Sequence, residues 1–195
     1  MILVSGFKPF LNEKINPSQM LVESIENDRI AKVILPVEFD RAFTVLSEQI
    51  ELLKPKIVIM LGQAGGRSKV SLEKIALNWR QTQSADESGY CPITGEIVSG
   101  ANLALMTRFS VDELYEYLLL RKLPVEISFS AGAFVCNDLY YKTLMNYPEI
   151  ESIFVHVPFI VEQNHMDKPM IQFNMLQEIL NHVVAYSTER IIART

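Results

Sequence analysis

The run Ile57-Val58-Ile59-Met60-Leu61 decides the fold, because every side chain in it is apolar. A strand without a polar face is typical of a parallel sheet that is covered on both sides. Two segments with strand character come before it, residues 2–5 and 31–37, and an apolar stripe over residues 39–53 predicts an amphipathic helix between the second strand and the third. This alternation predicts an α/β fold with a mostly parallel sheet between helices.

The first loop carries aromatic residues and leads into a helix. Gly6 ends the first strand, and the motif Phe7-Lys8-Pro9-Phe10 follows it directly. Asn16 in the N-cap position and Pro17 in the first helical position form a strong start signal for a helix. The sequence therefore predicts a loop that presents two phenylalanines beside a helix N-terminus.

The second half of the chain alternates strands and helices around one long irregular segment. Residues 69–79 have strand character, and residues 81–102 are rich in Ser, Gly, Pro and Asp, which predicts a long excursion of the kind that usually carries function. The other expected elements are a helix over residues 112–121 with Asp112 as its cap, a strand over 125–130, a helix around 135–146, a strand over 152–159 and a C-terminal helix within 169–192. We expect a single domain over residues 1–195.

The composition argues against several classes of protein. The 195 residues carry 18 Lys and Arg against 23 Asp and Glu, a net charge of −5, and no basic block that could neutralise a run of phosphates, so no nucleic-acid partner is expected. The longest apolar run, residues 57–61, is far below the roughly 20 residues of a membrane span. Because the apolar N-terminus lacks the basic region of a signal peptide, we expect a cytoplasmic protein with no membrane partner.

Cys136 is the candidate nucleophile. The chain has two cysteines, Cys91 and Cys136, which cannot by themselves form a disulfide framework or a zinc site. Cys136 lies where an expected strand gives way, through Ser130-Ala131-Gly132, to a helix. The free N–H groups and the dipole at the start of a helix favour a thiolate, which suits a nucleophile. The alternative is a buried small side chain without a chemical role.

His156 and Glu73 are the candidate partners of this thiol. His156 lies in Phe154-Val155-His156-Val157-Pro158, at the end of the following strand. Because successive parallel strands end on one side of a sheet, we expect it at the same edge as Cys136, where it could take the thiol proton and deliver it to a leaving amine. Glu73 interrupts an apolar segment and could orient the imidazole. A hydrogen-bonded core histidine and a glutamate on a solvent-facing strand edge are the alternatives.

Six blocks of sequence occur in a characteristic order. They are Phe7-Lys8-Pro9-Phe10 with Asn16-Pro17, Leu35-Pro36-Val37, Gly62-Gln63-Ala64-Gly65-Gly66-Arg67, Leu72-Glu73-Lys74-Ile75-Ala76-Leu77-Asn78, Ser130-Ala131-Gly132 through Cys136-Asn137, and His156-Val157-Pro158. Together they resemble the pyrrolidone-carboxylate peptidase family, also called pyroglutamyl peptidase I. The resemblance extends from Ser5 to about Pro158, and six ordered blocks are far more specific than a Cys-His pair alone.

The resemblance implies a cysteine peptidase that removes an N-terminal pyroglutamyl residue from peptides, with a three-layer α/β/α sandwich around a twisted, mostly parallel sheet. It implies no metal or organic cofactor, pyroglutamyl peptides as partners, and a homo-oligomer, namely a tetramer. The family's catalytic residues fall on Glu73, Cys136 and His156. The two aromatic residues that hold the lactam ring fall on Phe7 and Phe10, and further substrate-binding residues fall on Asn16, Gln63, Phe134 and Val135.

The sequence departs from the family pattern at a few positions. Leu11 and Asn12 stand where the family usually has two glycines, and Gln83 stands where the family has an arginine ten residues beyond its catalytic glutamate. Arg80 could reach in as a substitute for that arginine. Two alternatives therefore stay open, a hydrolase of another lactam or amide on the same fold and a pyroglutamyl-binding protein with little turnover. The glycine-rich residues 62–66 lack the Lys-Ser/Thr of a P-loop, which argues against nucleotide binding.

Overall fold

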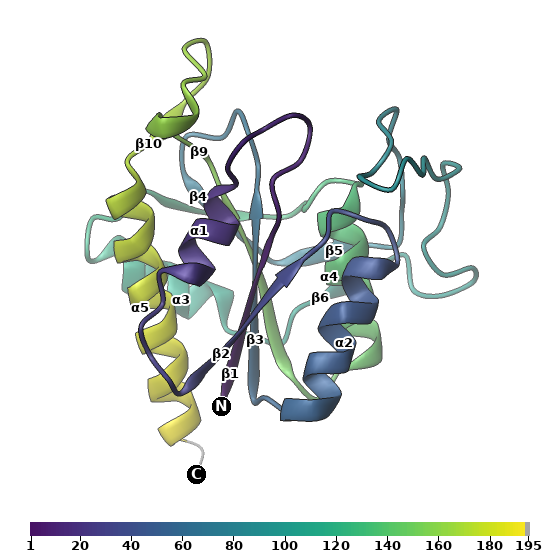
Figure 1. Cartoon of the computed structure of the whole chain (residues 1–195). Coiled ribbons are helices and arrows are strands. Elements are labelled where there is room, and N and C mark those ends of the chain that lie inside the picture. Colours follow the sequence, from purple (N-terminus) through teal and green to yellow (C-terminus); the bar gives the residue numbers. More distant parts are fainter. Residues whose placement is uncertain (194–195) are drawn as a thin grey trace.

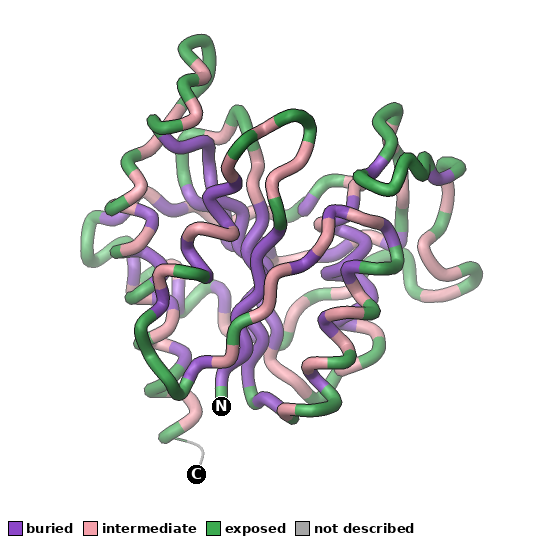
Figure 2. Tube along the Cα trace, viewed as in Figure 1, coloured by how far each residue is buried: buried purple, intermediate pink, exposed green. Residues whose placement is uncertain are grey.

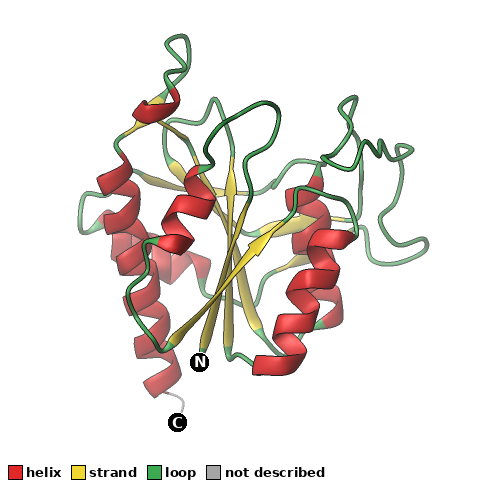
Figure 3. Ribbon diagram, viewed as in Figure 1, coloured by secondary structure: helices red, strands yellow, loops and turns green. Residues whose placement is uncertain are grey.

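The computed structural model describes residues 1–193, in which a six-stranded sheet has helices on both faces (Figures 1 and 3). The strands, in the order β2-β1-β3-β8-β4-β7 across the sheet, are β1 (Ile2–Phe7), β2 (Ile30–Leu35), β3 (Ile57–Gln63), β4 (Val70–Glu73), β7 (Val125–Ser128) and β8 (Glu151–Val157). The helices are α1 (Pro17–Glu23), α2 (Arg41–Leu53), α3 (Val111–Leu119), α4 (Val135–Asn146) and α5 (Phe173–Ala193). The predicted three-layer α/β/α sandwich is confirmed.

Two apolar cores, one on each face of the sheet, hold the layers together. Side chains alternate between the faces of a strand, so Leu3 and Phe7 of β1 pack on the side of α2 and α4, whereas Ile2 and Val4 pack on the side of α1, α3 and α5. The central strands β1, β3 and β8 are buried along nearly their whole length (Figure 2). The apolar run at 57–61 is thus buried on both faces, as its composition predicts.

The sheet is mixed. Strands β1, β2, β3 and β8 run parallel, but β4 runs antiparallel to β8 and β7 is parallel to β4, so both are reversed. The expectation that the strand before Cys136 and the strand of His156 end at one edge as parallel strands is therefore wrong. Only residues 64–69 connect β3 to β4, and a parallel strand there would need a crossover of a dozen or more residues.

Two small sheets interrupt the expected elements. The strand predicted over residues 69–79 divides into β4 and β5 (Ile75–Leu77), and β5 pairs with β6 (Ala104–Met106) outside the main sheet. The predicted excursion is irregular apart from one bridge between Arg80 and Gly95. Strands β9 (Phe159–Ile160) and β10 (Met170–Ile171) form the second small sheet, with the short helix η1 (Val161–Gln163) between them. The C-terminal helix begins at Phe173, four residues into the segment predicted to contain it.

Of the two predicted helix caps, Asn16 is confirmed and Asp112 is wrong. Asn16 has extended backbone angles (φ −129°, ψ 120°), its side chain accepts a hydrogen bond from the Ser18 N–H at 2.9 Å, and Pro17 is the first helical residue, as expected. The prediction that Asp112 caps a helix is wrong, because α3 begins one residue earlier, after Ser110. Asp112 lies in the first turn, and its carboxylate binds Lys74 Nζ at 2.6 Å.

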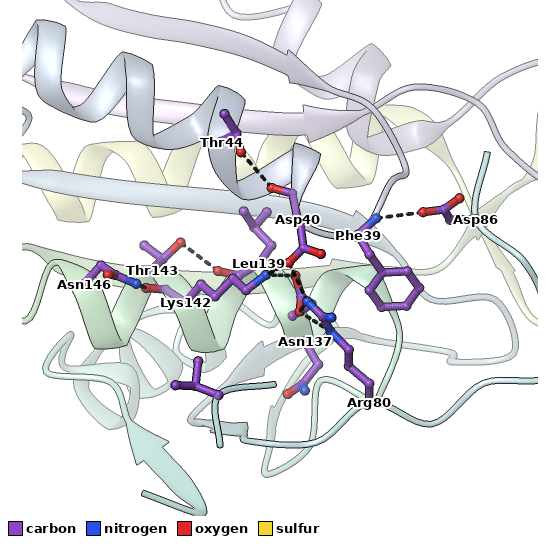
Figure 4. Close-up of polar contacts among 12 residues, drawn as sticks. Phe39, Asp40, Thr44, Arg80, Asp86, Asn137, Leu139, Lys142, Thr143 and Asn146 are labelled. Atoms are coloured by element: carbon purple, nitrogen blue, oxygen red, sulfur yellow. Dashed lines mark hydrogen bonds and ion pairs between the residues drawn. The ribbon is translucent and has the colours of Figure 1, made fainter. Parts of the chain in front are cut away.

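An ion network, buried except at Asp40, anchors α4, the helix that carries Cys136 (Figure 4). Asp138, only 2% exposed, accepts hydrogen bonds from Arg80 Nε at 2.7 Å and from Lys142 Nζ at 3.0 Å. Both cations also pair with Asp40, which precedes α2. The network therefore fixes the first turns of α4 against α2 and against the start of the excursion.

We expect Asp138→Asn to lower the free energy of unfolding by as much as about 3 kcal/mol, because it leaves two largely buried cations with only the exposed carboxylate of Asp40 as an ionised partner. Urea denaturation followed by circular dichroism measures the change. The matched control is Asp112→Asn, which breaks the ion pair of the 66% exposed Asp112 side chain with Lys74 and costs about 0 to 1 kcal/mol. Equal effects of the two substitutions would contradict an anchoring role for the buried network.

Candidate active site

Cys136 lies in the first turn of α4, and Gly62 of β3 makes room for its sulfur. A Cβ atom added at Gly62 would lie 3.1 Å from Cys136 Sγ and 2.7 Å from the ring of Phe154. The close approach of strand and thiol therefore requires glycine at this position. Gly62 is also the register partner of His156 in β8, so the sulfur lies beside the strand pair that carries the imidazole.

Glu73 holds the imidazole of His156. The distance from His156 Nδ1 to Glu73 Oε1 is 2.8 Å, and both side chains are buried. In the antiparallel register Ser71 faces His156 and Glu73 faces Phe154, so the contact is diagonal, between positions two residues apart. Within residues 1–193 the imidazole is hydrogen-bonded to Glu73 and not to Cys136. Thiol–imidazole contacts are often loose before substrate binds.

Arg67 is a fourth member of the site, which the sequence reasoning did not assign. Its Nη1 donates to Glu73 Oε1 at 2.7 Å, and its Nη2 donates to the backbone oxygen of Ser130 at 3.1 Å. The guanidinium thus connects the carboxylate to the segment that leads into Cys136. Its sequence signal was weak, namely its place at the end of the glycine-rich block 62–67.

Burial and the neighbouring groups shift the pKa values of both Glu73 and His156. Burial tends to raise the pKa of Glu73, but the hydrogen bond and charge of His156, together with the charge of Arg67, hold that pKa below its usual range. Burial lowers the pKa of His156 below its usual 6.5, and the hydrogen bond to Glu73 only partly offsets this effect. At neutral pH the site therefore holds an ionised carboxylate and a neutral imidazole.

The thiol is protonated at neutral pH. Burial raises the pKa of Cys136 to about 12, and the negative charge of Glu73 acts in the same direction, with Arg67 opposing it. A backbone N–H at the start of α4 lowers this pKa, in the direction expected for a helix N-terminus, but the loss of water around the sulfur has the larger effect. Since thiol and imidazole are both neutral, the proton must leave the sulfur during its attack and not before it.

The predicted substrate-binding residues at the aromatic loop and at α4 fall into two groups. Phe10 and Phe134 are half-buried and pack, like Cys136, against the core on the α2 and α4 side of the sheet. Phe7 and Val135 are 2% and 0% exposed and belong to that core. Phe10 and Phe134 are therefore partly accessible, whereas Phe7 and Val135 are enclosed in the core.

Asn16 shapes the first loop. Its Nδ2 donates to the backbone oxygen of Lys8 at 3.0 Å, and its Oδ1 accepts from both the backbone and the hydroxyl of Ser18. The residue is 1% exposed. Asn16 is thus engaged within the loop and holds the backbone on either side of Phe10.

The segment from η1 to His165 forms hydrogen bonds with the first loop and with the end of β3. The sequence reasoning did not single this segment out. Gln163 Nε2 donates to Gln63 Oε1 at 2.8 Å and approaches Glu13 Oε2 at 3.4 Å. His165 Nε2 lies 2.7 Å from Glu13 Oε1. With the oxygen of Gln63 held in this way, the N–H donors of its amide are the atoms that it can offer to a ligand.

Arg80 does not substitute for the arginine that the family has at position 83. Its Nε and Nη2 bind Asp138 and Asp40, and its guanidinium lies 5.3 Å from the centroid of the Phe39 ring. Gln83 is exposed and lines a surface groove. The cation beside Glu73 is Arg67.

Within residues 1–193 no group of three or more His, Cys, Asp or Glu side chains is arranged to hold a metal ion. Across the same part of the chain, no helix has both the length and the apolar character needed to cross a membrane.

A thiol at the start of a helix, beside a buried imidazole–carboxylate pair on an α/β/α sandwich, defines a cysteine hydrolase. Residues 1–192 match the family model described as pyroglutamyl peptidase. The chain therefore belongs to the pyroglutamyl peptidase family of cysteine peptidases. The resemblance read from the six sequence blocks is confirmed.

Named relatives and solved structures agree with this assignment. The chain is 38% identical to a pyrrolidone-carboxylate peptidase of Brachyspira hyodysenteriae, over 86% of this chain and 87% of that protein. It is 32% identical to the corresponding protein of Cupriavidus necator, over 94% and 91%. The crystal structure of pyrrolidone carboxyl peptidase from Fervidobacterium islandicum superposes with a TM-score of 0.91 at 28% identity and covers 96% of this chain and 98% of that one.

We expect the alkylation of Cys136 by iodoacetamide to accelerate steadily from about pH 7 to above about pH 10, because its pKa is raised. Glu73→Gln should move this profile to lower pH, because it removes a negative charge that disfavours the thiolate. Mass spectrometry follows the reaction in a Cys91→Ser background, which removes the exposed thiol. A plateau already below about pH 8 would instead reveal a preformed thiolate–imidazolium pair.

Proposed function

We propose that this chain hydrolyses the amide bond after an N-terminal pyroglutamyl residue, with Cys136 as nucleophile, His156 as general base and acid, and Glu73 orienting the imidazole. The observation that carries the proposal is the buried 2.8 Å contact between His156 Nδ1 and Glu73 Oε1, next to Gly62 and the thiol. A carboxylate on Nδ1 keeps the proton on that nitrogen and leaves Nε2 unprotonated. Nε2 is then the base.

Acylation starts from neutral partners. As Cys136 Sγ attacks the scissile carbonyl carbon, its proton passes to His156 Nε2, a C–S bond forms and the carbonyl π electrons move to the oxygen. Glu73 stabilises the imidazolium, as it already does in raising the pKa of His156 against the effect of burial. The C–N bond then breaks, His156 returns the proton to the departing amine, and a pyroglutamyl thioester remains. Water hydrolyses this thioester with His156 as base and restores the thiol.

The oxyanion would form at the N-terminus of α4. In this helix the N–H of Asp138 bonds to the oxygen of Phe134 at 3.1 Å, so the N–H groups of residues 135–137 precede the first helical hydrogen bond. These donors and the positive end of the helix dipole stabilise negative charge on an oxygen beside Cys136.

The acyl pocket suits an uncharged ring. A lactam has two apolar faces, one N–H and one C=O, for which the ring of Phe10 and the amide of Gln63 are complementary partners. The hydrogen bond from Gln163 to the side-chain oxygen of Gln63 fixes that amide, and the hydrogen bond from Asn16 to the backbone of Lys8 fixes the loop that carries Phe10. A charged glutamyl or prolinium residue would have to give up its hydration in the same place.

The sequence-based expectations of a homotetramer, a cytoplasmic location and a single domain stay predictions. Three strongly exposed apolar side chains lie on the excursion and in or beside β6. They are Ile93 at 93%, Leu103 at 75% and Met106 at 60% exposure.

Cys136→Ala should abolish hydrolysis of a pyroglutamyl chromogenic amide, whereas Cys91→Ser should leave kcat/KM unchanged. The reason is that only the first substitution removes the atom that forms the thioester, since Cys91 is an exposed residue of the excursion. Steady-state kinetics and circular dichroism of both variants provide the measurement. Loss of activity in both variants with the fold intact would refute the assignment, and binding of the amide by a wild type without turnover would favour the pyroglutamyl-binding alternative.

Phe10→Ala should lower kcat/KM for a pyroglutamyl amide by the equivalent of about 1 to 3 kcal/mol and reduce its discrimination against prolyl and glutamyl amides. The physical reason is the loss of an apolar surface for the lactam ring. The matched control is Phe43→Ala, which removes another half-buried ring, one that packs against Tyr147. Full activity and discrimination in Phe10→Ala would show that this ring belongs to the core alone.

A further inference from the structure

A surface groove lies beside the segment that leads into Cys136, and none of the steps above uses it. Its volume is about 640 Å³, within the range of about 300 to 1,000 Å³ typical of ligand sites. One wall is the start of the excursion with Trp79, Gln81 and Gln83, and the other is formed by Ser130, Gly132 and Ala133. The side chains that line it carry no ionised group.

Both walls of the groove are tied to the start of α4. The N–H of Gln81 donates to the oxygen of Ala133 at 3.1 Å. Asn137, the residue after Cys136, donates from its side chain to the backbone oxygens of Leu77 and Trp79 at 2.8 and 3.0 Å. The groove is thus held in a fixed position relative to the candidate nucleophile.

The groove and the acyl pocket are formed by opposite parts of the sheet. Phe10 and Gln63, which we assigned to the pyroglutamyl ring, follow or end β1 and β3. The groove is formed by the segment that follows β5 and by the segment that follows β7, and β7 lies at the far edge of the strand order β2-β1-β3-β8-β4-β7. The carbonyl that Cys136 attacks has the ring on one side and the departing amine on the other, so a ring held at β1 and β3 directs the departing chain toward the groove.

We propose that this groove binds the peptide that follows the pyroglutamyl residue, over the first few residues on the leaving-group side. This inference rests on the proposed function. Amide and hydroxyl side chains can exchange hydrogen bonds with a peptide backbone. The indole of Trp79, 41% exposed, offers an apolar face to a side chain of the bound peptide. Without ionised groups in its lining, the groove accepts acidic and basic peptides alike.

The test compares a short substrate, pyroglutamyl-alanine amide, with a longer one, pyroglutamyl-alanyl-phenylalanyl-alanine amide. In the wild type kcat/KM is expected to be higher for the longer peptide by about three- to tenfold, the size of one aromatic contact. Trp79→Ala should bring the ratio of the two kcat/KM values close to one. The control Leu120→Ala removes another exposed apolar side chain, at the end of α3 and outside the groove lining, and should keep the wild-type ratio.

A second variant covers the case in which Trp79→Ala does not fold. Gln83 is exposed, and Gln83→Glu places a negative charge in the groove. It should favour pyroglutamyl-alanyl-lysine amide over pyroglutamyl-alanyl-glutamate amide by about threefold or more, whereas the wild type should not separate them. Equal rates for short and long peptides in the wild type, or unchanged preferences in the variants, would overturn the groove assignment while cleavage of the short substrate still upholds the proposed function. Absence of cleavage of every pyroglutamyl substrate would overturn both.

Discussion

The buried contact between Glu73 and His156 is the constraint on which the rest of the site depends. A carboxylate without solvent is stable only when it is paired, and Glu73 Oε1 is shared between the imidazole at 2.8 Å and the guanidinium of Arg67 at 2.7 Å. Arg67 lies in the short loop between β3 and β4, and Glu73 is the last residue of β4. Both can reach His156 because β4 runs antiparallel to β8 and beside it. The reversed strand thus brings cation and carboxylate to one side of the imidazole within seven residues of chain.

This arrangement also determines how the thiol reacts. Glu73 raises the pKa of His156 and so helps it to accept a proton, but Glu73 also raises the pKa of Cys136. The groups that assist proton transfer from sulfur to imidazole therefore do not generate a thiolate by themselves. Charge separation between sulfur and imidazole becomes favourable only when an electrophile takes up the negative charge at the N-terminus of α4. A thiol that is protonated at rest is also a weak target for unrelated electrophiles and oxidants, because the thiolate is the reactive form.

The sequence predicts features that depend on residues close together in the chain. It does not predict features that depend on contacts between residues far apart in the chain. The apolar run at 57–61, the Asn16-Pro17 start and the helix at 135–146 are local patterns, and each lies where it was expected. No local pattern distinguishes a reversed β4 from a parallel one, because strand direction follows from the partner and from the length of the connection. Asp112 has the right side chain for a cap, but its partner Lys74 lies far away in the sequence.

The same distinction holds for the candidate site. Glu73 and His156 can be found because each is a polar residue within an apolar strand, and Cys136 can be found because it lies where a strand gives way to a helix. The sequence does not reveal the roles of Arg67, Gln163 and the network around Arg80. A polar residue in a loop has the same sequence pattern whether it faces water or contacts a partner from another element. Gln163 meets Gln63 over a separation of 100 residues.

The distribution of charge explains why an uncharged substrate fits this protein. Three cations around the site are paired, Arg67 with Glu73, and Arg80 and Lys142 with Asp138 and Asp40. The thiol and the imidazole are neutral, so little net charge faces the substrate. Recognition then depends on apolar surface and on hydrogen bonds, which a lactam without an α-ammonium group can satisfy without losing ionic hydration. A free N-terminal ammonium would find no unpaired carboxylate among these groups, and its desolvation would oppose binding.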